Sequence, residues 1–251
     1  MAETLSCSKS TIENHLHSLG YRRVLARWIP HVLTDATRAA RVSICESLLL
    51  RNHRKDFLAD LITGDESCIL YDNATRRAFW LPRGEEPPAQ PRRNPHGRKV
   101  LLSCFWDARG MLFWELLTGN DMVTAAVYCG QVHRLDAANR AKRPRRVDVN
   151  LLHDNARPHV ASATRRQLEQ FGCITVPHLA YSPDIAPSDY HLFRSLKNFL
   201  RSKTYSNFND LKSDLELFFE SQTPAFWAEG IQSLPERWRQ VVDTNGDYII
   251  A

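Results

Sequence analysis

The chain has 251 residues, of which 43% are hydrophobic, so it can bury one substantial core and is not a disordered protein. Its 33 Lys and Arg exceed its 28 Asp and Glu by five, a formal charge of +5 that suits a polyanionic partner but is also common among other basic proteins. Six cysteines lie far apart with no C-x-x-C pair, which excludes a zinc ribbon and a disulfide scaffold. With no secretory signal pattern and no apolar stretch long enough to cross a bilayer, neither secretion nor a membrane partner is expected.

The first predicted element is a short amphipathic helix over residues 8–19, with Ser10 or Thr11 as its cap. Its pattern is also that of any surface helix. The basic stretch that follows contains Arg22 and Arg23, which are candidate DNA-binding residues.

A longer helix is predicted over residues 34–50, capped by Thr34 or Asp35. Runs of apolar and β-branched residues then predict strands that pair in an antiparallel manner. The predicted strands are residues 61–71, 78–81, 100–106 and 111–117, the last two forming a hairpin that turns at residues 108–110. Residues 84–99 are rich in Pro and Arg and read as a solvated loop.

A second basic segment covers residues 140–146. It fits a nuclear-localisation signal, a contact to the DNA backbone and a solvated loop equally well. Its candidate DNA-binding residues are Arg140, Lys142, Arg143, Arg145 and Arg146.

The second half of the chain alternates strands and helices. A strand over residues 147–152 runs up to Asp154, and a helix after it stops at Gly172. A strand follows at residues 173–176, and a helix starts at Ser188, whose hydroxyl is its expected cap. Two terminal helices are predicted around residues 211–219 and 235–242. This order predicts an α/β protein with a sheet of mixed strand direction.

Three aspartates are candidates for a shared metal site. Asp154 and Asp189 are separated by 34 residues, and Asp65 lies upstream. Carboxylates that converge from distant segments suit two hard divalent cations acting on a phosphodiester. The spacing alone is weak evidence, because Asp154 could cap the following helix and Asp189 could interact with its own helix dipole.

The flanking residues carry a resemblance to a known family. The segments HDNARPH (153–159), YSPDIAPSDY (181–190) and TGDE (63–66) resemble the catalytic signatures of mariner transposases, the branch of the Tc1/mariner superfamily whose third acid is Asp. WIPHVL (28–33) is similar to the interdomain linker of that family, although Val32 stands where the family usually has an acid. With the ending NGDY (245–248), the resemblance spans nearly the whole chain.

The resemblance implies an RNase H-like fold, with a mixed sheet flanked by helices. It implies that Asp65, Asp154 and Asp189 are catalytic and hold two Mg²⁺ ions, for which Mn²⁺ can substitute. It also implies cleavage of double-stranded DNA at transposon ends, strand transfer into a TA target, a homodimer and action in the nucleus, with no small-molecule substrate.

By the same resemblance, residues 1–33 are the remnant of a second helix-turn-helix with the linker, so the chain is expected to be N-terminally truncated. Residues 34–251 are then the catalytic domain, with a clamp-loop insertion around residues 118–146 that serves dimerisation. The alternative is a catalytically idle DNA-binding protein derived from a truncated transposon copy. The family includes a chimera with a histone-lysine methyltransferase, but no methyl transfer is expected here.

Three neighbours of the aspartates have simpler interpretations. Glu66 points to the opposite face of a strand from Asp65, which predicts a structural role. His153 and His159 suggest zinc, but no Cys or further His stands at ligand spacing, so a zinc site is disfavoured.

Overall fold

The computed structural model describes residues 8–20, 30–52, 57–73, 97–118, 122–146 and 148–249. The chain divides into two compact units, Met1–Val32 and Leu33–Ala251. In the first unit, α1 (Lys9–Ser18) is the predicted helix. Its cap is Ser8, whose hydroxyl accepts a hydrogen bond from the backbone N–H of Thr11 at 3.1 Å, and not Ser10 or Thr11 as expected.

The second unit is built on a five-stranded sheet of order β3-β2-β1-β4-β5. The strands are β1 (Leu61–Leu70), β2 (Lys99–Asp107), β3 (Gly110–Leu117), β4 (Val149–Leu152) and β5 (Cys173–Thr175). β1, β2 and β3 pair in an antiparallel manner, whereas β4 is parallel to both β1 and β5. The predicted mixed sheet and its hairpin are therefore confirmed.

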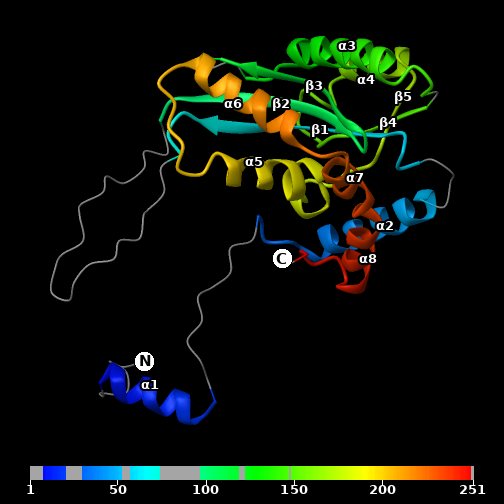
Figure 1. Cartoon of the computed structure of the whole chain (residues 1–251). Helices are drawn as coiled ribbons and strands as arrows, with labels where there is room; N and C mark the ends of the chain where they lie inside the picture. The colour runs from blue at the N-terminus through cyan, green and yellow to red at the C-terminus, as the bar shows by residue number, and fades with distance from the viewer. Residues whose placement is uncertain are drawn as a thin grey trace. The chain divides into compact units, whose positions relative to one another are not determined.

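Helices cover both faces of this sheet (Figure 1). They are α2 (Asp35–Asn52), α3 (Ala125–Lys142), α4 (Ser162–Gln170), α5 (Arg194–Phe199), α6 (Phe208–Ser221), α7 (Pro224–Gln232) and α8 (Leu234–Asp243). A 3₁₀ turn, η1 (Pro183–Ile185), and a π-helical segment, η2 (Ser188–Phe193), precede α5. α3 and α4 pack on one face, and α5 lies against the other (Figure 1).

The hydrophobic core has two clusters, one on each face of the sheet, because side chains along β1 point alternately to the two faces. Ile62 faces the cluster beneath α3 and α4, while Leu61 and Ile69 face the larger cluster formed with the remaining helices. Successive side chains therefore serve opposite layers. Asp65 and Glu66, which are adjacent, must point to opposite faces for the same reason.

Several expectations can be compared with the described elements. Within residues 118–146, where a clamp-loop insertion is expected, Ala125–Lys142 form α3 and pack on the sheet. Three terminal helices follow α5 in place of two, since α7 lies between the predicted ones. Val147 and the strand expected at 78–81 lie outside the described residues, as does most of the 84–99 loop.

Two bulk expectations can be compared with the structure. No helix within the described ranges is long and apolar enough to span a membrane. The five cysteines in those ranges are free thiols; Cys45 and Cys104 are buried, whereas Cys68 is exposed.

Candidate active site

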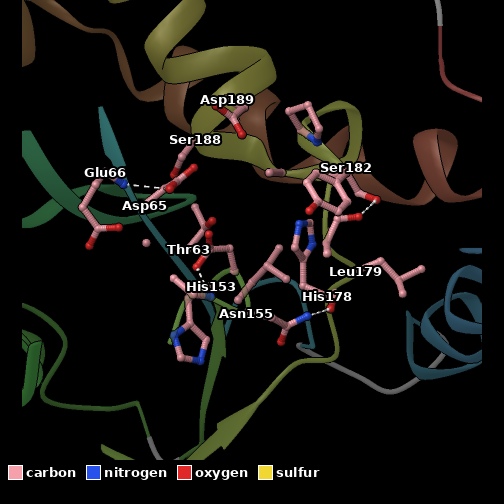
Figure 2. A pocket seen from close by; sticks show the side chains of 18 residues that line it. Thr63, Asp65, Glu66, His153, Asn155, His178, Leu179, Ser182, Ser188 and Asp189 are labelled. Carbon is pink, nitrogen blue, oxygen red and sulfur yellow. Dashed lines mark hydrogen bonds between the residues drawn. The ribbon is translucent and has the colours of Figure 1, made fainter. Parts of the chain in front are cut away.

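A cavity of about 510 Å³ lies where β1, the end of β4 and the start of η2 meet. All three predicted aspartates line it, Asp65 from β1, Asp154 from the segment after β4 and Asp189 from η2. Figure 2 shows the carboxyl groups of Asp65 and Asp189 turned toward each other across it. The fold thus brings together residues that are far apart in the sequence.

Asp65 is placed by the close packing of β1. The neighbouring Gly64 has no room for a side chain, because an added Cβ would lie 2.4 Å from the ring of Phe105 on β2. The Glu66 backbone N–H donates to Asp65 Oδ1 at 2.7 Å. Burial raises the pKa of Asp65 well above its ordinary value, and the negative charges of Asp189 and Glu66 raise it further.

Asp189 lies in the first turn of η2, as predicted. Ser188 does not cap this helix; its buried hydroxyl accepts a hydrogen bond from Trp106 Nε1 at 3.1 Å, which fixes the helix start against β2. Burial raises the pKa of Asp189, Lys197 opposes the rise, and Asp154 adds to it. A π-helical turn at this point is a common feature of functional sites.

Asp154 differs from the other two because it is held by donors. Its Oδ1 accepts hydrogen bonds from His159 Nδ1 at 2.5 Å and from the Ala156 backbone N–H at 2.9 Å. Burial opposes the charged form, but these two hydrogen bonds prevail and lower the pKa of Asp154. Asp154 does not cap the next helix, because α4 begins only at Ser162.

The donor set fits a hard divalent cation, since carboxylate oxygens are the ligands that Mg²⁺ prefers. The raised pKa values of Asp65 and Asp189 mark negative charge that a cation would neutralise. Across the part of the chain that the structure describes, no three His, Cys, Asp or Glu side chains are grouped as they would be around a bound ion. The carboxylates share one cavity, and binding an ion there requires side-chain movement.

The loop between Tyr181 and Asp189 is anchored by a residue that the sequence did not reveal. Arg41 on α2 is buried and binds both carboxylate oxygens of Asp184, at 3.0 and 2.6 Å. It also donates to the Ser182 hydroxyl and to the carbonyl of Gly246. A buried arginine cannot be recognised in an amphipathic helix pattern, because its partners lie more than a hundred residues away.

The basic segment at residues 140–146 is mostly committed to the fold. Arg143 and Arg146 bind the fully buried Asp107 at 2.9 and 2.7 Å, so both guanidinium groups are already paired within the fold. Lys142 donates to two backbone carbonyls of β3, and Arg140 pairs with Asp136. Arg145 is exposed and has no ion pair with a described residue, while Arg22 and Arg23 lie outside the described ranges.

Glu66 and His153 also line the cavity, whereas His159 lies outside its lining. Glu66 and His159 are 3.5 Å apart, on the sheet face opposite Asp65. Burial lowers the pKa of His159, but hydrogen bonds to Asp154 and Glu66 outweigh it and raise the pKa to about 9. His153 bonds the Tyr128 hydroxyl at 2.7 Å, and burial lowers its pKa to about 4.

A mixed five-stranded sheet with helices on both faces, bearing one carboxylate on a strand, one just after a second strand and one on a helix, is the architecture of an RNase H-like catalytic domain. A family model described as "Transposase (partial DDE domain)" matches residues 70–149. The chain is 37% identical over 253 residues to the Mariner Mos1 transposase of Drosophila mauritiana, covering 99% of this chain and 73% of that protein. The chain therefore belongs to the mariner transposase family.

Other comparisons agree with this assignment. The chain is 38% identical over 253 residues to the Histone-lysine N-methyltransferase SETMAR of Homo sapiens, covering 99% of this chain but only 37% of that protein. The Mos1 paired-end complex with Mg is similar with a TM-score of 0.91 and 38% identity, covering 99% of this chain and 74% of that one. The Mos1 catalytic domain gives a TM-score of 0.75 at 37% identity, covering 89% and 100%.

Proposed function

We propose that this chain cleaves DNA strands at transposon ends and joins them to target DNA, with Asp65, Asp154 and Asp189 as its catalytic residues. The observation that supports this role is the shared cavity, into which three separate elements bring one carboxylate each. The carboxyl groups of Asp65 and Asp189 face each other, and within the described residues the positive charge that opposes the raised pKa of Asp189 is that of Lys197. Such an arrangement costs stability, which is typical of a site kept for chemistry.

The same three aspartates are the proposed ligands of Mg²⁺ or Mn²⁺, in a two-ion site. When bound, such ions lower the pKa of the attacking water and stabilise the leaving oxygen of the phosphodiester. The presence of Mg in a Mos1 paired-end complex supports this choice of metal.

The residues around the cavity hold the three aspartates in position and set their charge for metal binding. β1 and η2 hold Asp65 and Asp189 in a partly buried position. Their negative charges repel each other there, and this repulsion favours the binding of a cation. Asp154 stays ionised because His159 and the Ala156 N–H stabilise its negative form. The Ser188–Trp106 hydrogen bond keeps the helix that carries Asp189 in register with the sheet.

The proposed partners are double-stranded DNA, as transposon ends and as a TA target, and a second copy of this chain. A TA step suits a target because pyrimidine-purine steps deform at low cost. Residues 1–33 are proposed to carry part of a helix-turn-helix with the linker, and residues 118–146 are a proposed dimer contact that is largely helical. The exposed Arg140 and Arg145, with Arg22 and Arg23, are the remaining candidates for phosphate contacts. DNA transposition places the proposed site of action in the nucleus.

The idle DNA-binding alternative has no observation in its favour. All three aspartates are present and line the same cavity. A catalytically idle copy would be free to lose Asp65 or Asp189, because among the described residues neither is paired with a buried cation, whereas Asp154 is paired with His159.

A cleavage assay tests the proposal. Purified protein is incubated with supercoiled plasmid and with linear DNA that carries mariner ends, in Mg²⁺, Mn²⁺ or chelator. We expect nicking that requires metal and disappears in Asp154→Asn. Asp148→Asn is the matched control, because Asp148 is exposed and does not line the cavity. Nicking that survives chelation or the Asp154 substitution would refute the assignment.

A further inference from the structure

His159 lies between two carboxylates and contacts both. Its Nδ1 is 2.5 Å from Asp154 Oδ1, and its Nε2 is 3.5 Å from Glu66 Oε2. The imidazole is 2% exposed, and Glu66 is 15% exposed. Because each ring nitrogen faces an acceptor-only group, both nitrogens are placed to donate, and the ring links the two acids.

The orientation of this ring is fixed by aromatic packing. The ring of Tyr128 on α3 lies with its centroid 4.0 Å from that of His159, and the ring of His153 lies 5.2 Å away on centroids. The Tyr128 hydroxyl bonds His153 Nδ1 at 2.7 Å, which ties these two neighbours together. The imidazole of His159 therefore has little freedom to rotate away from Asp154.

Glu66 is supported in turn by a polar chain that leads to α3. The Ser103 hydroxyl lies 3.5 Å from Glu66 Oε1 and accepts a hydrogen bond from Gln131 Nε2 at 2.9 Å. Gln131 also donates to Glu115 at 2.8 Å. Both Ser103 and Gln131 are fully buried, so Glu66 is held from behind by groups that water does not reach.

The consequence concerns Asp154, whose side chain is 49% exposed. The two hydrogen bonds to Asp154 occupy its Oδ1, and the second oxygen is left for other ligands. Because these hydrogen bonds hold Oδ1 in place, Oδ2 of Asp154 points in a defined direction. Adjacent residues of β1 would then serve the site from opposite faces: Asp65 in the cavity, and Glu66 from behind through His159.

We propose that His159, supported by Glu66, is a positioning residue that orients Asp154 for divalent-cation binding. This inference rests on the proposed function and adds to it a hydrogen-bonded support behind one metal ligand. Such supports are important because removing the partner of a ligating group weakens metal binding by roughly 10- to 100-fold.

Two amide substitutions at His159 distinguish a role in orienting Asp154 from a role in which the imidazole ring only fills space. In His159→Asn the amide nitrogen takes the place of Nδ1 and still donates to Asp154, whereas in His159→Gln it takes the place of Nε2 and reaches only toward Glu66. Mn²⁺ binding to the full chain is measured by titration calorimetry. We expect His159→Asn to bind nearly as the wild type does, and His159→Gln to bind about 10- to 100-fold more weakly.

A filling role predicts the reverse order, because Asn leaves the larger void. Equal Mn²⁺ affinity in both variants and the wild type, with thermal unfolding confirming that they are folded, would overturn the inference. If His159→Gln does not fold, Glu66→Gln takes its place; it keeps an acceptor for Ser103 but removes the charge that faces His159, and weaker Mn²⁺ binding is expected. His133→Gln is the matched control, because His133 is exposed on α3, does not line the cavity and should leave Mn²⁺ affinity unchanged.

Plasmid nicking at increasing Mn²⁺ distinguishes this inference from the proposed function. Positioning predicts that His159→Gln needs more Mn²⁺ for half-maximal nicking and recovers much of its rate at saturation. If Asp154→Asn abolishes nicking while His159→Gln has an unchanged Mn²⁺ requirement, the positioning role fails and the proposed function stands. If the wild type neither binds Mn²⁺ nor nicks DNA, the proposed function fails and this inference with it.

Discussion

Asp107 and Asp65 lie on neighbouring strands, and the fold treats their charges in opposite ways. Asp107 at the end of β2 is fully buried between Arg143 and Arg146, and although burial alone would raise its pKa, bonds to these arginines lower it. Asp65 on β1 is buried beside further acids, and burial together with these like charges raises its pKa. Burial of a charge beside its counter-charge supports a fold, whereas burial beside like charges has to be offset elsewhere.

This contrast shows which charged segments are available for function. Residues 140–146 contain the densest run of basic residues in the described chain, yet Arg143 and Arg146 are used internally. The acidic residues around the cavity are spread over the sequence and form no run at all. The density of charge along the sequence is therefore a poor guide to which charged residues are available for function, because a partner in the folded structure decides whether a charge is paired.

The largest effect is expected from Asp65→Asn. Nicking should fall by about 10³-fold, since a charged group that acts directly in the reaction is lost. The melting temperature should stay equal or rise, because the substitution removes repulsion from Asp189 and Glu66. The two measurements are a metal-dependent nicking assay and thermal unfolding. A large fall in melting temperature would show that Asp65 stabilises the fold and would break the contrast with Asp107.

The second effect is on stability. Asp107→Asn should lower the free energy of unfolding by about 3–5 kcal/mol, because it leaves two buried guanidinium groups without their counter-charge. Urea unfolding gives this value. Asp136→Asn is the control: it removes a pair with Arg140, whose side chain is 69% exposed, and should cost far less than Asp107→Asn. Similar losses in the two variants would contradict the difference in burial.

The pH dependence of the free energy of unfolding gives an independent check on the role of Asp107. Its folded-state pKa lies below the ordinary 3.8, so on acidification the unfolded chain takes up the proton first. The stabilisation by this cluster is therefore fully present above about pH 4 and is lost as pH falls through the folded-state pKa. In Asp107→Asn the free energy of unfolding should depend less steeply on pH in this acidic range.

The smallest effect concerns DNA affinity. Arg145→Ala should leave stability within about 0.5 kcal/mol, and it should make the slope of log affinity against log salt shallower by about one. Arg143→Ala should do the opposite, lowering stability and leaving the salt slope unchanged, because its guanidinium binds Asp107. DNA binding at several salt concentrations decides between them. A changed salt slope in folded Arg143→Ala would mean that its ion pair opens on DNA.

Much of the fold could be predicted from the sequence because it depends on local patterns. The β2-β3 hairpin, the helix α2 and the position of Asp189 in a first helical turn agree with the predicted elements. Resemblance to a known family also placed the candidate aspartates, which line one cavity. Glu66 was expected behind the sheet from strand alternation alone, and its pairing with His159 on that face agrees.

The sequence by itself determined the order of the elements and the identity of the candidate acids, because periodicity and motif lie within short segments. Only the tertiary structure decided which charges are paired: the arginines around Asp107, the contact of Arg41 with Asp184, and the link from Glu66 through His159 to Asp154. It also placed α3 within the expected clamp-loop insertion and replaced the expected cap at Ser188 with a bond to Trp106. The physical reason is that a charge or a hydroxyl is satisfied by whatever lies beside it in space, and those partners are distant in the chain.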